Sequence, residues 1–304
     1  LDYGVEAKEN QDEFDANLAE QLRAISFADG NASVPYVSCK VTGYAPFSLL
    51  EKMASNQELD EAESAARGRM MDRLHQICEA AAQLDVALYV DAEESWIQDA
   101  IDSVVDTLME RFNRDKPAVF NTVQLYRHDR LTFLQGSHQR AVASGYVLGV
   151  KLVRGAYMEK ERDRAKELGY PSPIHESKEA VDTDFDAAIV YCLEQLDEIA
   201  FCAATHNEKS CQLVVETAKA LGVDLQHAHI HFAQLYGMSD HISFNLASAG
   251  FNASKYVPYG PVRDVVPYLI RRAQENRSVS GQVGRELGLI LAEIDRRKAV
   301  AKGG

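Results

Sequence analysis

Residues 149–157 read GVKLVRGAY, an apolar β-forming run that passes into a polar, glycine-bearing tail. Helical periodicity separates it from seven runs of the same form: LDYGVE (1–6), YVSCKVT (36–42), VALYVDAE (86–93), VFNTVQLY (119–126), AFCAATHN (200–207), HIHFAQLYG (229–237) and SKYVPYG (254–260). Eight strands alternating with helices are typical of a closed parallel (β/α)8 barrel, a TIM-type α/β fold. Active sites of such barrels lie where the strands end, so we expect the tails to carry the functional residues.

The length and composition indicate one domain. The chain has 304 residues, somewhat more than the ~250 typical of one barrel. We therefore predict a single barrel domain over 1–304, with a further helix near 286–301 whose apolar side packs on another surface. Hydrophobic residues make up 46% and charged residues 26%, as in ordinary globular proteins. No apolar run approaches the ~20 residues of a membrane span, so no transmembrane segment is expected.

Charge and cysteine content narrow the class of partner and compartment. The formal charge of −14 and the pI of about 5.1 disfavour a nucleic-acid partner, because phosphate binding depends on Lys and Arg. The number of cysteines is odd and no C-x-x-C pair occurs, so we expect buried free thiols in a reducing compartment. The five are Cys39, Cys78, Cys192, Cys202 and Cys211.

Apolar periodicity also predicts where several helices lie. The stretch 46–84 is expected to hold two helices with a break near 55–56, and 96–112 is a clean amphipathic helix. Further helices are predicted over 159–168, 182–199 and 208–221. The segment 261–276 follows the eighth strand, and we expect its helix to lie over the active site.

That last predicted helix carries a pair of arginines. Tyr268, Arg271, Arg272 and Glu275 are spaced by three, four and seven residues, which places them on one helix face. Arg binds planar carboxylates or phosphates with a two-pronged fork. A bare Arg-Arg pair is more often a solvated salt-bridge face. Lys40 at another strand end and the aromatic Tyr268 nevertheless favour a small carboxylate substrate with an apolar body.

Polar residues at three other strand ends are candidates for ligand contacts. Asp91 ends the third strand, a position that is catalytic or orienting more often than structural in barrels, whereas Glu93 and Glu94 are expected to be solvated. The run 205–207, Thr-His-Asn, predicts a ligand-facing edge. Small residues in 154–156, Arg-Gly-Ala, would let a bulky planar ligand approach the backbone.

Alternating histidines raise the question of a metal. His227, His229 and His231 share one strand face, but they precede the carboxyl end of the strand, so no metal site is predicted. The chain has no G-x-G-x-x-G between strand and helix, no G-x-x-x-x-G-K-[ST] loop and no G-x-S-x-G elbow. These absences disfavour a Rossmann dinucleotide domain and a nucleotide hydrolase.

The motifs VKLVRGAY (150–157), ATHN (204–207), QLYGM (234–238), KYVPYGPV (255–262) and PYLIRRAQEN (267–276) together resemble the proline dehydrogenase family. The resemblance runs from residue 1 to about 276 and implies a monofunctional enzyme or an isolated domain. It implies an FAD-dependent barrel that transfers hydride from C5 of L-proline to the flavin, giving Δ1-pyrroline-5-carboxylate, with a membrane quinone as electron acceptor. The implied location is mitochondrial in a eukaryote, or cytoplasmic and peripherally membrane-associated in a bacterium.

The resemblance also assigns roles to residues. Lys40, Arg271 and Arg272 would hold the proline carboxylate, and Tyr157, Leu235, Tyr256 and Tyr268 would surround the ring. Asp91 would hydrogen-bond Tyr256, Lys151 would lie near the flavin N5, and Glu6 would pair with Arg271 as a gate. Lys178 would reach the pyrophosphate. Further expected flavin contacts are Ala92, Gln124, Leu152, Val153, Arg154, Gly155, Ala156, Thr205, His206, Asn207, Gln234 and Glu275.

Three alternatives remain open at this point. The hydroxyproline-oxidising branch resembles this sequence but has a smaller Ser where Tyr256 stands. A metal-dependent barrel hydrolase could use the alternating histidines with Asp91. A non-catalytic barrel that binds small acids would bind ligand without reducing a dye.

Overall fold

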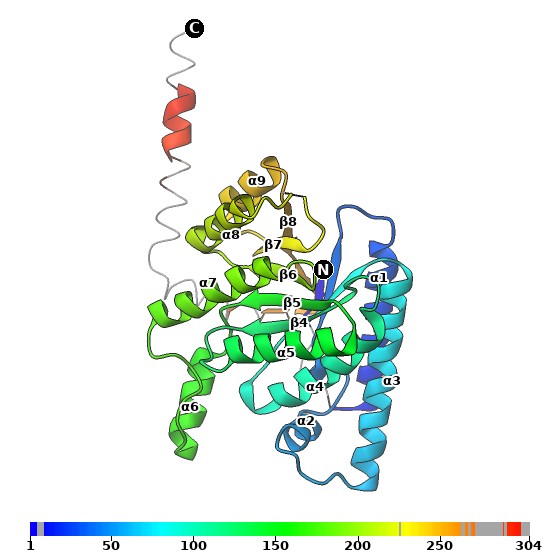
Figure 1. Ribbon diagram of the computed structural model, residues 1–304. Helices are drawn as coiled ribbons and strands as arrows, with labels where there is room; N and C mark the ends of the chain where they lie inside the picture. The colour runs from blue at the N-terminus through cyan, green and yellow to red at the C-terminus, as the bar shows by residue number, and fades with distance from the viewer. Residues whose placement is uncertain are drawn as a thin grey trace.

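The structure is a computed structural model that describes residues 1–4, 9–224, 226–262, 265–266, 269–270, 288 and 291–298. Within them, nine parallel strands form one sheet in the order β8-β7-β6-β5-β4-β3-β2-β1-β9, with helices around it (Figure 1). The strands are β1 Asp2–Tyr3, β2 Tyr36–Cys39, β3 Ala87–Val90, β4 Val119–Gln124, β5 Leu148–Val153, β6 Ile199–Ala204, β7 Ile230–Leu235, β8 Asn252–Tyr256 and β9 Pro258–Tyr259. Every predicted strand is present, and the predicted TIM-type fold is confirmed.

The eighth predicted strand divides in two and closes the barrel. β8 pairs with β7, while β9, one residue later, pairs with β1 through Asp2–Pro258 and Tyr3–Tyr259. Proline has no N–H to give to a ladder. Along this edge the N–H groups of Asp2 and Gly4 instead donate to the carbonyls of Val257 and Tyr259, at 3.0 and 2.9 Å.

Helices follow most strands. They are α1 Gln11–Ala28, α2 Phe47–Ala54, α3 Glu61–Gln83, α4 Ser95–Phe112, α5 Arg130–Ser144, α6 Met158–Leu168, α7 Lys178–Glu194, α8 Glu208–Ala220 and α9 Asp240–Ser248, with a short 3-10 helix η1 at Val41–Gly43. The predicted break near 55–56 is confirmed: Asn56 has a positive φ of 52°, and Asp60 forms a capping box with Glu63. α7 begins four residues before the predicted start because Ser177 accepts from the Ala180 N–H.

Two apolar layers hold the barrel together. The larger one lies between the outer strand faces and the helices and includes Val37, Leu88 and Leu152. The smaller one includes Tyr89, Phe120 and Cys202, which belong to β3, β4 and β6. The five cysteines are buried free thiols, as predicted.

The C-terminal part is described in fragments only. Residues 291–298 are helical, within the predicted helix near 286–301. Leu291 and Ile294 are 51% and 40% exposed, so their expected covering is not found among the described residues. Most of 261–276, including its expected position over the site, lies outside them. Of the helices that the structure describes, none combines the length and the apolar character needed to cross a bilayer.

Candidate active site

The carboxyl ends of the strands surround a cavity of about 1830 Å³. Side chains from β2 to β8 and from the loops that follow them line it, so the tails of the predicted strands do converge. Among the residues proposed to hold substrate, Lys40, Tyr157, Leu235 and Tyr256 line the cavity, as do Asp91 and Lys151.

Asp91 is the centre of a buried charge cluster in this cavity. Lys151 forms an ion pair with Asp91 Oδ1, and Lys40 Nζ lies 3.7 Å from Oδ2. The Tyr256 hydroxyl donates to Oδ2 at 2.8 Å, so the expected Asp91–Tyr256 hydrogen bond is present. Burial alone would raise the pKa of Asp91, but the ammonium groups of Lys151 and Lys40 outweigh burial and hold that pKa below its ordinary value.

Asp2 belongs to the same cluster and was not predicted. Its side chain is fully buried on β1, and its Oδ2 lies 3.8 Å from Lys40 Nζ. Burial raises the pKa of Asp2, against the opposing charge of Lys40. Lys40 therefore lies between two carboxyl groups, those of Asp2 and Asp91. The signal in the sequence was a charged residue inside the first predicted strand, where an apolar side chain is the rule.

Most of the expected flavin-contacting residues also line the cavity. These are Ala92, Gln124, Lys151, Val153, Arg154, Gly155, Ala156, Lys178, Thr205, His206, Asn207 and Gln234. Leu152 is the exception. Because side chains of a strand alternate between its faces, Lys151 and Val153 point inward and Leu152 points outward into the core. The Leu152 side chain is therefore turned away from the cavity, and the expected flavin contact of Leu152 stays a prediction that only its backbone could satisfy.

Five expected site residues fall outside the described residues: Glu6, Tyr268, Arg271, Arg272 and Glu275. The arginine pair, the gate and the aromatic residue beside the arginines thus remain predictions. Of the three side chains expected to bind the proline carboxylate, Lys40 is the one that lies in the described part of the chain.

Arg154 joins the rim of the cavity to its surrounding helices. Its guanidinium donates to Asp182 at 2.7 Å, to the Thr205 hydroxyl at 2.7 Å and to the Ser210 hydroxyl at 3.0 Å. Lys178 also pairs with Asp182. Burial would raise the pKa of Asp182, but these two cations lower it. The rim of the cavity thus carries two basic side chains with one carboxylate between them.

Gly155 is required for a different reason from the expected one. Its φ is +140°, a conformation that L side chains rarely adopt, and a Cβ here would overlap the ring of Tyr126. The sequence suggested that a small residue admits a planar ligand. In the structure, backbone conformation and the Tyr126 ring already demand glycine.

The expectation that Glu93 and Glu94 are solvated is wrong. Their exposed fractions are 2% and 6%. Glu93 accepts hydrogen bonds from the N–H and the hydroxyl of Thr42, at 3.2 and 2.5 Å, and Glu94 pairs with Lys160. Burial raises the pKa of Glu93 to about 8. The residues DAEE alone do not show that the distant loop after β2 covers Glu93.

The alternating histidines lie at the amino end of β7 and bond to backbone and tyrosine. His231 contacts the Tyr36 hydroxyl and lies 2.6 Å from the Ala228 carbonyl oxygen, and His229 Nδ1 lies 2.7 Å from that of Leu196. In the part of the chain that the structure describes, no group of three His, Cys, Asp or Glu residues could hold a metal ion.

Several known proteins resemble this chain. "Proline dehydrogenase 1, mitochondrial" of Drosophila melanogaster is 41% identical over 238 residues, 75% of this chain and 35% of that protein. The carbapenem antibiotics biosynthesis protein CarD of Pectobacterium carotovorum subsp. carotovorum is 35% identical over 297 residues, 98% of this chain and 77% of that protein. The chain spans about a third of the length of the Drosophila relative.

A solved structure supports the same fold. Proline utilization A from Bdellovibrio bacteriovorus, inactivated by N-propargylglycine, superposes with a TM-score of 0.81 at 21% identity, covering 92% of this chain and 30% of that one. The family model described as proline dehydrogenase matches residues 1–285. A match of that length, over a barrel whose strand ends gather the expected lysines, aspartate and tyrosine, shows that the chain belongs to the proline dehydrogenase family.

Proposed function

We propose that this chain oxidises L-proline to Δ1-pyrroline-5-carboxylate, passing hydride from C5 to FAD and then electrons to a membrane quinone. The observation that supports this most is the cluster of Lys40, Asp91, Lys151 and Tyr256 inside one cavity of a family member's barrel. A small zwitterionic substrate needs a cation for its carboxylate and an aromatic wall for its ring, and this cluster offers both.

The cavity fits a flavin dinucleotide beside a small substrate. Its volume of about 1830 Å³ exceeds the ~300–1,000 Å³ common for single small ligands. Lys151 is buried deep in the cavity, whereas Arg154 and Lys178 lie at its rim, which suits a ring system inside and a pyrophosphate outside. Bound FAD would supply the hydride acceptor.

Lys40 would bind the substrate carboxylate, together with Arg271 and Arg272. Its ammonium group is held near both Asp2 and Asp91, so its position is set before substrate arrives. A charge-assisted contact in this buried setting is stronger than one in water. Fixing the carboxylate would in turn fix the position of the proline C5. Hydride transfer requires C5 to lie ~3–3.5 Å from the flavin N5.

Lys151 would contribute positive charge next to the flavin ring, near its N5 atom. Its ammonium group lies 5.4 and 5.3 Å from the ring centres of Tyr89 and Tyr256, and its pairing with Asp91 fixes it there. A fixed cation stabilises negative charge that develops during the reaction, without reorganising solvent. The same pairing would orient Tyr256 against the substrate ring.

Tyr256 would also select the substrate. The Xenopus laevis hydroxyproline dehydrogenase is 37% identical over 243 residues, so both substrates occur among the relatives. Here a full tyrosine ring, tied to Asp91, occupies the wall where the hydroxyproline branch has Ser. A ring hydroxyl would meet that wall, so we expect proline to be preferred.

Purified protein reconstituted with FAD tests the proposal. It should be yellow, proline should bleach it under anaerobic conditions, and an amine trap should detect the cyclic imine product. Hydroxyproline should bleach it more slowly, and a soluble quinone should restore the colour. Stoichiometric zinc in a colourless protein would favour a hydrolase, and proline binding without bleaching would favour a non-catalytic acid-binding barrel.

The proposed location follows the relatives. The Drosophila and Homo sapiens relatives are named mitochondrial. We expect a mitochondrial location in a eukaryote, and a peripheral association with the cytoplasmic membrane in a bacterium. Co-sedimentation with quinone-containing vesicles, before and after reduction by proline, measures that association.

A further inference from the structure

Glu93 lies in the segment after β3. It bonds to Thr42 in the segment after β2 and to the side chain of Gln124 at the end of β4. Its carboxylate accepts two hydrogen bonds from Thr42, in the 3-10 turn that begins directly after Lys40. Its own segment begins with Asp91, two residues earlier. Its backbone carbonyl accepts from Gln124 Nε2 at 2.7 Å. Glu93 therefore bonds to Gln124, stands two residues from Asp91, and bonds to Thr42, which itself stands two residues from Lys40.

The geometry at Thr42 suits a carboxyl group in particular. The N–H and hydroxyl of Thr42 present two donors, 3.2 and 2.5 Å from the two oxygens of Glu93. An ionised carboxylate accepts at both oxygens, whereas a protonated carboxyl or an amide of the same shape would place its own donor against one of the Thr42 donors. Glu93 is 2% exposed, so a donor left without a partner would not find water there.

Gln124 is held at both ends of its amide. Nε2 donates to Glu93, and Oε1 accepts from the Ala156 N–H at 3.4 Å, in the loop after β5. Gln124 lines the cavity and is 3% exposed. The Glu93 carbonyl thus sets the rotation of an amide that faces the proposed flavin site.

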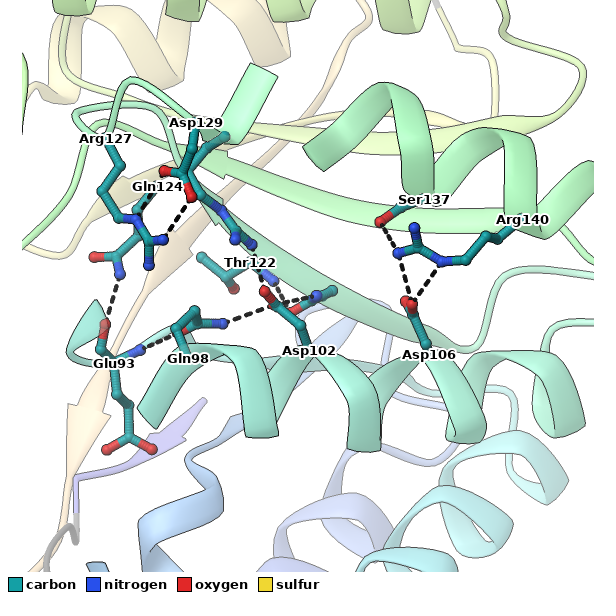
Figure 2. A network of polar contacts seen from close by, with 12 residues as sticks. Glu93, Gln98, Asp102, Asp106, Thr122, Gln124, Arg127, Asp129, Ser137 and Arg140 are labelled. Atoms are coloured by element: carbon teal, nitrogen blue, oxygen red, sulfur yellow. Dashed lines mark hydrogen bonds and ion pairs between the residues drawn. The ribbon is translucent and has the colours of Figure 1, made fainter. Parts of the chain in front are cut away.

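A buried polar chain fixes Glu93 from behind, as Figure 2 shows. The Glu93 N–H donates to Gln98 Oε1 at 2.8 Å, and Gln98 Nε2 donates to Asp102 Oδ1 at 2.8 Å. Asp102 Oδ2 in turn accepts from Arg130 at 2.6 Å. Gln98 and Asp102 belong to α4 and Arg130 begins α5, so the chain connects the strand ends to two helices.

We propose that Glu93 is a positioning residue: its side-chain carboxyl group fixes the turn that places Lys40, and its backbone carbonyl fixes the amide of Gln124. The inference rests on the proposed function, because it takes Lys40 as a substrate-binding group and Gln124 as a flavin contact. Glu93 is not among the residues that line the cavity, so it would touch neither substrate nor flavin. It would hold the Lys40 ammonium, which binds the substrate carboxylate, and the Gln124 amide, which contacts the flavin, at fixed positions relative to each other.

The two contacts can be tested separately, beginning with the carboxylate. Thr42→Val removes the hydroxyl donor at nearly constant volume, and Thr42→Ser restores it. Thr42→Val should raise KM for proline about 10-fold, with kcat within about 2-fold and an unchanged FAD dissociation constant, while Thr42→Ser stays near wild type. Glu93→Gln keeps the backbone contacts. In assays at about pH 9, above the Glu93 pKa of about 8, the wild-type carboxyl is ionised and Glu93→Gln should reproduce Thr42→Val, so it carries the test if Thr42→Val does not fold.

A double-mutant cycle shows whether the two residues act as one unit. If the hydrogen bond between them carries the effect, Thr42→Val combined with Glu93→Gln should raise KM no further than either change alone. Multiplied effects would mean that the residues act independently, and would overturn the assignment.

The second contact is probed at Gln98. Gln98→Met removes the acceptor for the Glu93 N–H and should shift the backbone carbonyl that holds Gln124. We expect the apoprotein to bind FAD about 10-fold more weakly, with a shifted flavin absorption band, and KM for proline within about 2-fold of wild type. Unchanged FAD affinity together with an unchanged spectrum would refute this part of the proposal.

Asn113→Ala is the matched control for loss of stability alone. Asn113 is fully buried and bonds to Val119 and Val147 at the opposite end of the barrel. It should lower the melting temperature without moving KM or FAD affinity. If Thr42→Val also lowers only the melting temperature, Glu93 has a structural role and the inference fails.

Failure of the proposed function would be recognised separately. Wild-type protein that does not oxidise proline would refute the function. Crystal structures of wild type and Thr42→Val would then still decide the positioning role: it requires Lys40 Nζ to move away from Asp91 in the variant, and an unmoved Lys40 contradicts it.

Discussion

The Tyr256 hydroxyl donates a 2.8 Å hydrogen bond to Asp91, which stands 165 residues earlier in the chain. The bond joins β8 to the end of β3 across the cavity. Asp91 also pairs with Lys151 and lies near Lys40, so one carboxylate orients an aromatic wall and two cations. Substitutions at Tyr256 should therefore change substrate binding more than they change folding stability.

We predict that Tyr256→Ser increases the ratio of hydroxyproline to proline turnover, because it opens the wall of the ring pocket. Tyr256→Phe keeps the wall and loses the hydrogen bond, worth about 0.5–1.5 kcal/mol, so proline KM should rise by about 2- to 10-fold. Comparing kcat/KM for both substrates measures this. Equal ratios in wild type and Tyr256→Ser would show that Tyr256 does not set specificity.

Lys40→Met, Arg271→Met and Arg272→Met should each lose most of the affinity for proline. Removing one partner of a charge-assisted pair in a partly buried site lowers binding by roughly 2–5 kcal/mol. Arg23→Met is a matched control, because Arg23 pairs with Glu20 on α1, with 76% of its side chain exposed. Steady-state KM and inhibitor binding report the loss. Unchanged KM in all three variants would contradict the carboxylate assignment.

Glu6→Ala should weaken the binding of proline analogues. The expected pairing of Glu6 with Arg271 would close the site over the substrate and exclude water. Isothermal titration with a non-oxidisable cyclic carboxylate measures the affinity directly. An Ala variant that binds as tightly as wild type would count against the gate, whatever happens to turnover.

Glu93 should make folding stability depend on pH. Burial raises its pKa from 4.5 to about 8, in a setting where Glu94 adds to the rise and Thr42 and Lys40 oppose it. Between these values the folded protein binds a proton that the unfolded chain has lost. Stability therefore falls as pH rises through this range, by up to about 1.4 kcal/mol per pH unit, and levels off above it.

Glu93→Gln should remove that slope. Urea unfolding between about pH 5 and pH 8 measures it in both proteins, and the difference between the two curves isolates Glu93 from the other titrating groups. Parallel curves would mean that the Glu93 carboxyl is not buried in the way the structure describes.

Asp102→Ala should be strongly destabilising. Asp102 pairs with Arg130 at 2.6 Å, and their side chains are 6% and 2% exposed. Removing one member of a buried pair typically lowers stability by about 3–5 kcal/mol, because the other charge stays buried without its partner. Asp102→Leu with Arg130→Met should lose less than Asp102→Ala alone. Chemical denaturation distinguishes these outcomes.

Part of the site was predictable because it depends on chain-local rules. Lys40 and Asp91 stand at or near the ends of predicted strands, and parallel strands of a barrel bring such ends together. Lys151 was expected from the family resemblance alone. Successive side chains of a strand point to opposite faces, so Leu152 points outward, although the family resemblance included it among the flavin contacts. The hydrogen bond between Asp91 and Tyr256 came from the family resemblance, since no local pattern pairs residues so far apart.

The alternation of strands and helices can be predicted from the amino-acid sequence, because the apolar period and the capping residues act over a few neighbouring positions. Three features depend on contacts between distant segments: Glu93 is buried against Thr42, Asp2 flanks Lys40, and the last strand divides at Val257 to close the barrel. Burial of a polar side chain depends on which distant segment covers it. Glu93 and Thr42 are 51 residues apart, and Lys40 and Asp2 are brought together only when β1 pairs with β2.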